Sequence, residues 1–300
     1  MNPRSLALLA ATSASTIYGI NHTIAKGLMP EIIQPFGFIL LRVSGAAILF
    51  WGFSFFYPSE RIEKKDFYRF ILCALFGMVL NMNMFFKGLE LSTPVNSSVV
   101  ITVAPVLLLI LTAVFLKEKI TWYKSIGIFL GLVGVLTLIL FGAKSQPNAP
   151  NIPLGNFFFI INAASYSVYL ILVKPLIGKY SSITLMKFFF LFAVLMNLPI
   201  GISQLTEVNW VSLQFSEILK LLFVVVGTTF LTYLFNIYAL KQLSPSVIGA
   251  FMYLQPVVAT LFALLVGVDS LTPLRLLAAS FIFMGVFLTT RKTKKTPINR

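Results

Sequence analysis

The back half of this 300-residue sequence repeats the front half, and this repeat constrains the fold more than any other feature. When Phe85–Val135 is laid over Asn236–Val286, the two segments align without a gap at a constant offset of 151 residues. If each copy contains five membrane-crossing helices, the odd number makes the second copy enter the bilayer from the opposite side. Inverted repeats of this kind are typical of transporters that expose one central site to either face in turn. The matched positions are Leu89 with Leu240, Pro94 with Pro245, Pro105-Val106 with Pro256-Val257, Glu118 with Asp269, Thr121 with Thr272, Lys124 with Arg275, and Gly134-Val135 with Gly285-Val286.

The composition agrees with a chain that lies in a bilayer. Hydrophobic residues make up 58% of the sequence and charged residues only 11%, which no ordinary soluble core requires. A bilayer-crossing helix needs about 20 mostly apolar residues. We therefore predict an all-α integral membrane protein of ten transmembrane helices, built as two inverted five-helix repeats over residues 1–144 and 145–300. The predicted spans are Leu6–Ala25, Phe36–Phe56, Phe67–Phe86, Pro94–Leu116, Trp122–Phe141, Leu154–Val173, Ile183–Ser203, Ile218–Leu240, Pro245–Gly267 and Pro273–Thr290.

The basic residues predict how the chain is oriented. A net charge of +14 would suggest nucleic-acid binding in a soluble protein, but lysine and arginine also accumulate in the cytoplasmic loops of membrane proteins. Most of them fall in the segments on the same side as the N-terminus, so we predict a multi-pass inner-membrane protein with both termini cytoplasmic and no nucleic-acid partner. A cleavable signal peptide is the less favoured interpretation of the first span, because Tyr18 and Lys26 match Tyr166 and Lys174 at an offset of 148 residues.

A proline, an acidic residue at a helix end and glycines in the next helix recur in both halves. The first copy reads Pro94, Pro105, Leu116-Lys117-Glu118-Lys119-Ile120, Gly127 and Gly134, and the second reads Pro245, Pro256, Asp269 and Gly285. With Arg42 early in the second helix, this pattern resembles the EamA-type branch of the drug/metabolite transporter superfamily. The resemblance implies the ten-helix fold and the export of amino acids and other metabolites. The chain departs from the family's pattern at Tyr18, where tryptophan is frequent, and at Asp269, where glutamate is usual.

Polar residues within the spans are the candidates for a substrate site, because a polar group in hydrocarbon must find a partner. Each of these side chains taken alone is equally compatible with hydrogen bonding between neighbouring helices. Together they fall on the first, third, fourth, sixth, eighth and ninth helices, which the resembled fold places around its cavity. The predicted substrate-binding residues are Tyr18, His22, Arg42, Asn83, Asn162, Tyr166, Asn236 and Tyr253.

For four residues in the predicted spans, the sequence is compatible with two different roles. Arg42 either binds a substrate carboxylate or braces the bundle, and His22 lies either at the cavity rim or in a proton relay. Pro105 and Pro256 each remove a helical hydrogen bond in mid-span, and their matched places suit either a gating hinge or a static kink.

The leading hypothesis is a secondary transporter that exports amino acids or related amphipathic compounds by alternating access. No G-x-x-x-x-G-K-[ST] loop is present, which argues against a nucleotide-driven pump, and one histidine and nine carboxylates argue against a membrane enzyme. A channel-like facilitator and a proton-coupled antiporter remain alternatives. Because no carboxylate is predicted in the middle of a span, we favour facilitated diffusion or exchange over proton antiport. We expect no cofactor or metal, a small-molecule substrate, the lipid bilayer as surroundings, and a monomer or homodimer.

Overall fold

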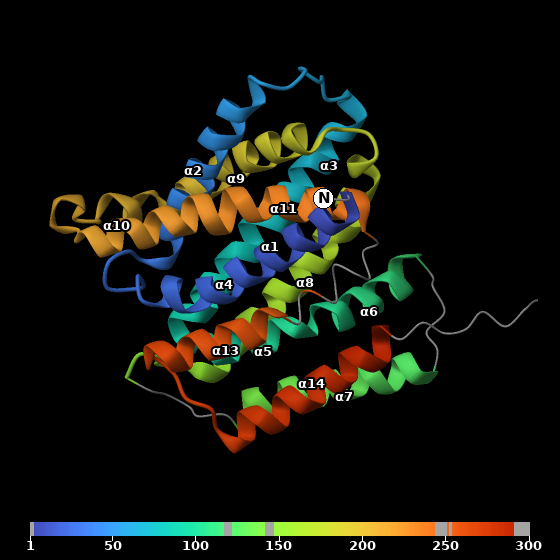
Figure 1. The fold of residues 1–300 in the computed structure, drawn as a ribbon, viewed down its shortest axis with the longest axis vertical. Coiled ribbons are helices and arrows are strands. Elements are labelled where there is room, and N and C mark those ends of the chain that lie inside the picture. Colours follow the sequence, from blue (N-terminus) through green and yellow to red (C-terminus); the bar gives the residue numbers. More distant parts are fainter. Residues whose placement is uncertain (1–2, 117–121, 142–146, 244–250, 252–253, 291–300) are drawn as a thin grey trace, which may run out of the picture.

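The structure is a computed structural model, and it describes residues 3–116, 122–141, 147–243, 251 and 254–290. Each of the ten predicted spans coincides with helix where it is described, apart from one or two residues at the ends of three spans, and the helices lie together as one bundle (Figure 1). No strand occurs in these described ranges. The prediction of an all-α protein is confirmed.

The first repeat contributes its five spans as nine helical segments. The first two spans are unbroken, whereas the third and fourth change helical type part of the way along. The segments are α1 (Pro3–Lys26), α2 (Pro35–Ser54), α3 (Lys64–Ala74), η1 (Leu75–Leu80), α4 (Asn81–Leu91), α5 (Pro94–Val100), η2 (Ile101–Val103), α6 (Ala104–Leu116) and α7 (Trp122–Leu140).

The second repeat has the same order of five spans as the first. A short 3₁₀ turn, η3 (Trp210–Ser212), lies in the loop between its second and third spans. The other described segments are α8 (Ile152–Ile177), α9 (Ser182–Thr206), α10 (Phe215–Leu222), η4 (Phe223–Leu231), α11 (Thr232–Gln242), α13 (Leu254–Val266) and α14 (Pro273–Thr290).

The third span of each repeat contains a π-helical segment at an equivalent place. These segments are η1 in the first repeat and η4 in the second. At the repeat offset of 151 residues, Leu75–Leu80 corresponds to 226–231, which lies within η4. The π-helix is rare and is frequently found at functional sites, and here it occurs once in the third span of each repeat.

Pairs of helices contact one another in a way that reflects the inverted repeat. The second spans pack together (α2 with α9), and so do the fifth spans (α7 with α14). The first span packs on the third span of the other repeat in both directions, α1 on α11 and α8 on α4. Figure 1 shows α7 and α14 side by side along one edge of the bundle, and α1 beside α13. The duplication therefore extends from the sequence to the packing.

Glycines allow the fifth spans to approach at backbone distance. A Cβ added to Gly285 would lie 2.5 Å from the carbonyl oxygen of Gly127, and one added to Gly134 would lie 2.7 Å from the carbonyl oxygen of Ala278. Gly134 and Gly285 are equivalent in the repeat, as are Gly127 and Ala278. The same close contact is therefore made twice, as expected for small residues at a membrane-helix interface.

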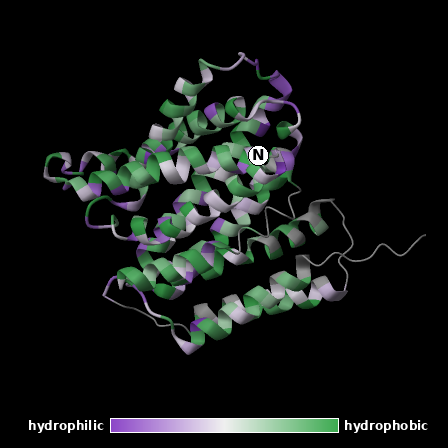
Figure 2. Cartoon of the chain, in the orientation of Figure 1, coloured by the Kyte–Doolittle hydropathy of each residue, from purple (hydrophilic) through white to green (hydrophobic). Residues whose placement is uncertain are grey.

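The outer surface suits lipid rather than water. Large apolar side chains such as Ile48, Val114, Phe129 and Leu261 are more than half exposed, and Figure 2 shows hydrophobic colouring along the helices. By length and composition, five helical stretches among the described residues can cross a membrane, and shorter apolar helices accompany them. The long stretches are Pro35–Ser54, Lys64–Leu91, Ile152–Ile177, Ser182–Thr206 and Phe215–Ala239.

Polar contacts tie helix ends together at both ends of the bundle. At the end that carries the N-terminus, Lys179 pairs with Asp66 and Glu63, each at 2.6 Å. At the opposite end, Lys26 Nζ donates to the carbonyl oxygens of Leu89 and Glu90 at 2.7 and 2.8 Å. Helix ends leave carbonyl groups without intrahelical partners, and Lys26 supplies donors to two of them at the end of α4.

An ion pair between Arg275 and Asp269 lies at this opposite end, and hydrogen bonds that both side chains form with the first repeat link the two repeats. Arg275 Nη1 lies 2.6 Å from Asp269 Oδ1, and Arg275 Nη2 donates to Thr93 Oγ1 at 3.2 Å. Asp269 Oδ2 accepts from the backbone N–H of Val95 at 3.0 Å. The Asp269 carboxylate thus caps the first turn of α5, which belongs to the other repeat.

Candidate functional site: a central pocket between the repeats

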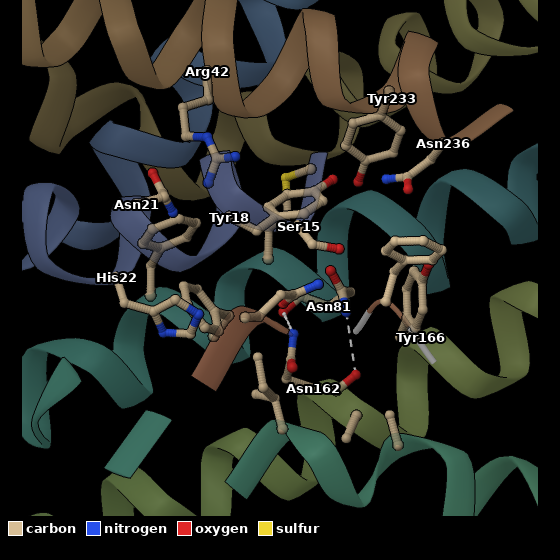
Figure 3. A pocket seen from close by; sticks show the side chains of 18 of the residues that line it. Ser15, Tyr18, Asn21, His22, Arg42, Asn81, Asn162, Tyr166, Tyr233 and Asn236 are labelled. Atoms are coloured by element: carbon tan, nitrogen blue, oxygen red, sulfur yellow. Dashed lines mark hydrogen bonds between the residues drawn. The ribbon is translucent and has the colours of Figure 1, made fainter. Parts of the chain in front are cut away.

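A pocket with a cavity volume of about 150 Å³ lies in the middle of the bundle. Residues from α1, α2, α4, α6, α8, α11 and α13 line it, so both repeats contribute. Figure 3 shows their polar side chains converging on the space between the helices. A cavity of this size in a protein accommodates a small organic molecule such as benzene.

One face of α1 supplies Tyr18, Asn21 and His22. These residues recur at one-turn spacing, so they lie on the same side of the helix. His22 Nδ1 lies 2.6 Å from Ser97 Oγ, and the Ser97 hydroxyl donates to the carbonyl oxygen of Pro94 at 2.9 Å. Since a hydroxyl has one hydrogen, this pattern fits donation from His22 Nδ1. The side-chain oxygen of Asn21 is buried without a protein partner among the described residues.

Asn81 on α4 and Asn162 on α8 form a reciprocal clamp across the pocket floor. Asn162 Nδ2 donates to the carbonyl oxygen of Asn81 at 2.8 Å, and Asn81 Nδ2 donates to the carbonyl oxygen of Asn162 at 3.2 Å (Figure 3). Both side chains also line the pocket. Asn162 therefore has both of the positions considered in the sequence analysis, because it forms hydrogen bonds between neighbouring helices and also lines the cavity.

Arg42 reaches the pocket from α2 and is only 4% exposed. Its Nε donates to Thr229 Oγ1 at 3.0 Å, and its Nη2 lies 3.5 Å from Thr228 Oγ1. Its guanidinium carbon lies 4.6 Å from the centre of the Phe86 ring, which is a favourable cation–π distance. The guanidinium is thus held in one orientation by neutral groups.

Tyrosines and an asparagine form the part of the pocket nearer the N-terminal end of the bundle. Tyr18, Tyr166, Tyr233 and Asn236 line both the main pocket and a smaller adjoining cavity of about 40 Å³. The smaller cavity continues along α8 past Tyr169 and ends among apolar residues that include Val173 and Ile177. A narrow, mostly apolar route therefore extends from the pocket along α8.

The structure brings together six of the eight predicted site residues, namely Tyr18, His22, Arg42, Asn162, Tyr166 and Asn236. It does not bring Asn83 to the pocket. The Asn83 amide donates to Asn197 Oδ1 on α9 and to the carbonyl oxygen of Val79, both at 2.7 Å. Asn83 therefore joins two helices. Tyr253 lies outside the residues that the structure describes.

The structure describes the first predicted hinge proline together with the residues before it, and the second without residues 252–253. Pro105 is the second residue of α6, the helix that directly follows the 3₁₀ turn η2. Pro256 is the third residue of α13 and is buried. The change from 3₁₀ to α-helix next to Pro105 suits a residue that cannot donate a helical hydrogen bond.

The predicted set of eight residues did not include several that line the pocket. These are Ser15, Asn21, Asn81, Tyr233, Gln255 and aromatic residues such as Phe85 and Phe86. For the residues on α4, the helical spacing could have predicted which ones line the pocket. Asn81 and Phe85 are one turn apart, as are Met82 and Phe86, and all four face the pocket. Asn83 is half a turn away from Asn81 and consequently points elsewhere.

The pocket's side chains suit binding more than bond-breaking chemistry. They combine aromatic rings, amides and a guanidinium, and none of the lining residues is acidic. Within the described residues, no group of three or more His, Cys, Asp or Glu side chains is arranged to hold a metal ion. Apolar walls with a few placed polar groups are typical of sites for small organic ligands.

Two segments of the chain, residues 5–140 and 153–291, match the EamA-like transporter family. An uncharacterized transporter of Archaeoglobus fulgidus is 27% identical over 282 residues, which cover 92% of this chain and 96% of that protein. An S-adenosylmethionine uptake transporter of Rickettsia conorii is 23% identical, with 85% of this chain and 81% of that protein covered. A solved crystal structure with 19% identity superposes with a TM-score of 0.65 over 95% of this chain and 97% of that chain. That structure shares the fold.

Proposed function

We propose that this protein, which belongs to the EamA-like transporter family, exports small organic metabolites by alternating access. Membership of that family makes it a multi-pass membrane transporter of a small molecule and not an enzyme. Amino acids and related amphipathic compounds are the proposed substrates. The observation that carries this proposal is the central pocket, to which both inverted repeats contribute. A site at the interface of inverted repeats is where alternating-access carriers bind their substrates.

The lining of the pocket favours an uncharged, zwitterionic or singly charged molecule with an apolar part over a strongly charged one. Phe85, Phe86 and the tyrosines provide aromatic walls, whereas Asn162 and Asn236 provide amide groups. A multiply charged solute would lose its hydration without sufficient compensation in such a site. Because one relative is named as an uptake transporter, the assay must measure flux in both directions.

Passive exchange is the proposed mode of energy coupling, and proton antiport is the alternative. Among the described residues, no acidic side chain lines the pocket, although acidic side chains are common proton relays in membrane transporters. One observation favours the alternative: His22 lines the pocket and is 2% exposed. Uphill transport driven by an imposed pH gradient, and its loss in His22→Gln, would identify a proton-coupled mechanism.

The proposed topology places the protein in the inner membrane with both termini in the cytoplasm and the repeat boundary at residues 144–145. The excess of lysine and arginine in loops on the N-terminal side supports it, since such residues accumulate in cytoplasmic loops. In a Cys73→Ser background, a cysteine at position 148 should react with an impermeant thiol reagent from outside, and one at position 296 should not. The opposite labelling would refute this topology. A monomer or a homodimer is proposed as the assembled form.

Counterflow in proteoliposomes tests the proposed function. Vesicles preloaded with unlabelled metabolites are expected to accumulate the same labelled compound, with saturation, when the correct substrate is present. Asn236→Ala should reduce the saturable flux at equal protein abundance, whereas Asn209→Ala, in an exposed loop, should not. Flux that does not saturate would instead identify a channel-like facilitator, and unchanged counterflow in Asn236→Ala would exclude this pocket.

A further inference from the structure

Arg42 is a buried cation that has no acidic partner among the described residues. The chain has nine acidic residues, and all of those that the structure describes lie in loops or in the end turns of helices, whereas Arg42 is the eighth residue of the twenty-residue helix α2. Its electrostatic neighbours are the hydroxyl groups of Tyr18 and Tyr233. An arginine within a membrane span normally pairs with an acidic group or faces an internal cavity, and Arg42 does the latter.

The protein fixes the orientation of this guanidinium. Thr228 and Thr229 each direct their hydroxyl hydrogen to the carbonyl oxygen of Val224, at 2.6 and 2.8 Å. Since each hydroxyl has a single hydrogen, its oxygen then acts as an acceptor for Arg42. The π-helical segment η4 brings the two adjacent hydroxyls to the same carbonyl, and Phe86 covers one face of the guanidinium.

One edge of the guanidinium is left for a ligand. Nε and Nη2 are directed at threonine oxygens, and Nη1 has no hydrogen-bond partner among the described residues. Figure 3 shows the side chain extending from α2 into the pocket. A guanidinium is a strong and directional donor to a carboxylate, and a charge removed from water requires compensation.

We propose that Arg42 is the carboxylate anchor of the substrate site, so that the transported molecules are small carboxylates with an apolar side chain, either amino acids or simple monocarboxylates. This inference rests on the proposed transport function and adds which substrate group is recognised and by which residue. The carboxylate neutralises Arg42, and the apolar part of the substrate lies against Phe85, Phe86 and the tyrosines of the pocket.

Matched compounds test this assignment with the intact protein. Leucine, leucinamide, 4-methylpentanoate and 4-methylpentanamide share one carbon skeleton, and each acid differs from its amide at the carboxylate alone. Shorter and aromatic pairs of acids and amides extend the series. In counterflow, the acid of each transported pair is expected to saturate at a concentration about tenfold or more below that of its amide.

Variants separate the anchor from general stability. Arg42→Gln should abolish the preference for the acid over its amide, and Arg42→Lys should retain part of it. Thr229→Val, in which the guanidinium loses its positioning acceptor, should reduce the preference severalfold while the protein remains folded. Lys187→Gln removes another buried cation that does not line the pocket, and it should leave the preference unchanged. If Arg42→Gln cannot be purified, Arg42→Lys and Thr229→Val decide the question.

The outcomes distinguish failure of this inference from failure of the proposed function. If no compound in these pairs or in a broad metabolite panel shows counterflow, the transport proposal fails, and the inference fails with it. If acids and amides saturate alike, or if Arg42→Gln keeps the preference for acids, transport stands and the anchor is refuted. An acid preference that disappears in Arg42→Gln and persists in Lys187→Gln supports the anchor.

Discussion

The second spans of the two repeats pack against each other, and each carries one buried cation, yet the two cations have different surroundings. Arg42 on α2 lines the pocket and has threonine hydroxyls as partners. Lys187 on α9 does not line the pocket, and its Nζ lies 5.1 Å from the Trp51 ring and 5.3 Å from the Phe188 ring. The two repeats thus share a helix arrangement and differ in what their charged residues contact.

An acidic group accompanies Lys187 but not Arg42. Partial burial raises the pKa of Glu60, but hydrogen bonds from Ser181 and the positive charge of Lys187 together hold that pKa below its ordinary value. The two repeats therefore pack alike, whereas their buried cations act on different groups.

The largest effect is expected where the repeats are most alike. Gly134→Val and Gly285→Val each place a side chain against backbone atoms of the facing helix, which cannot move aside without separating α7 from α14. Overpacking of this kind costs about 3 kcal/mol or more. Thermal unfolding in detergent should show similar losses for both variants. Gly52→Val, at a position with nothing within 4 Å, is the control, and tolerance of only one of the two valines would show that the repeats are not equivalent here.

A buried ion pair gives the next largest effect. The Arg275 and Asp269 side chains are 6% and 1% exposed, so Asp269→Asn leaves a buried cation uncompensated and should cost about 3 kcal/mol. Unfolding in a chemical denaturant would measure the loss. Removing the cation as well, in Asp269→Asn/Arg275→Met, should recover part of the stability. A double variant less stable than Asp269→Asn would mean that Arg275 acts mainly through its bond to Thr93.

A smaller effect should distinguish two lysines at equivalent places. Lys26 donates to two backbone carbonyl groups, whereas Lys174, at the same point of the second repeat, is exposed. Lys26→Met should therefore destabilise the protein by about 1–2 kcal/mol, the cost of buried acceptors without donors, and Lys174→Met should change stability by less than about 0.5 kcal/mol. Equal melting temperatures for the two variants would contradict this difference.

The smallest effect concerns the exposed ion pair between Glu63 and Lys179. Hydrogen bonds from Lys179 hold the pKa of Glu63 below its ordinary value, and Asp66 and Glu63 raise the pKa of Lys179. The stabilisation from Glu63 is complete above the unfolded-state pKa of about 4.3 and is lost as the pH falls through the lower folded-state pKa. The stabilisation from Lys179 is lost only as the pH rises through its raised pKa.

Melting curves at several pH values test this pair. Wild type should melt slightly above Glu63→Gln near neutral pH, and the difference should disappear once the pH is low enough to protonate Glu63. The difference should also shrink with added salt, because the pair is exposed. A difference that persists in acid and high salt would mean that Glu63 contributes through packing.

The sequence was sufficient to predict the ten spans and most of the pocket, because bilayer-length apolar stretches and polar residues within them are signals that survive without tertiary information. It was insufficient to separate Asn81 from Asn83. Both are asparagines in the same span, and only the rotation of α4 decides which one lines the pocket and which one bonds to Asn197.

Other features depend on contacts between distant segments and were not predictable. The Thr228 and Thr229 hydroxyls gain their importance from Arg42, almost two hundred residues away. Likewise, the partner that orients His22 is Ser97, on a different span. No local sequence pattern predicts such pairings. The π-helical segments η1 and η4 were also not predicted, because the sequence signals for an irregular helix, Pro105 and Pro256, lie in the fourth spans and these segments lie in the third spans.

The two π-helical segments also set the rotational phase of everything that follows them. A π-helix contains more residues per turn than an α-helix, so each residue of η1 rotates the chain about the helix axis by a smaller angle. The total rotation from α3 to α4 is therefore smaller than it would be if the same residues formed an α-helix. Each residue of an α-helix advances the rotation by about 100°. If the same residues, Leu75–Leu80, wound as α-helix, Asn81 and Phe85 would therefore be rotated relative to α3 and would no longer face the cavity as they do, with no change in sequence. In this protein, the helical type of η1 decides which residues of α4 line the pocket, in addition to the amino-acid sequence of α4.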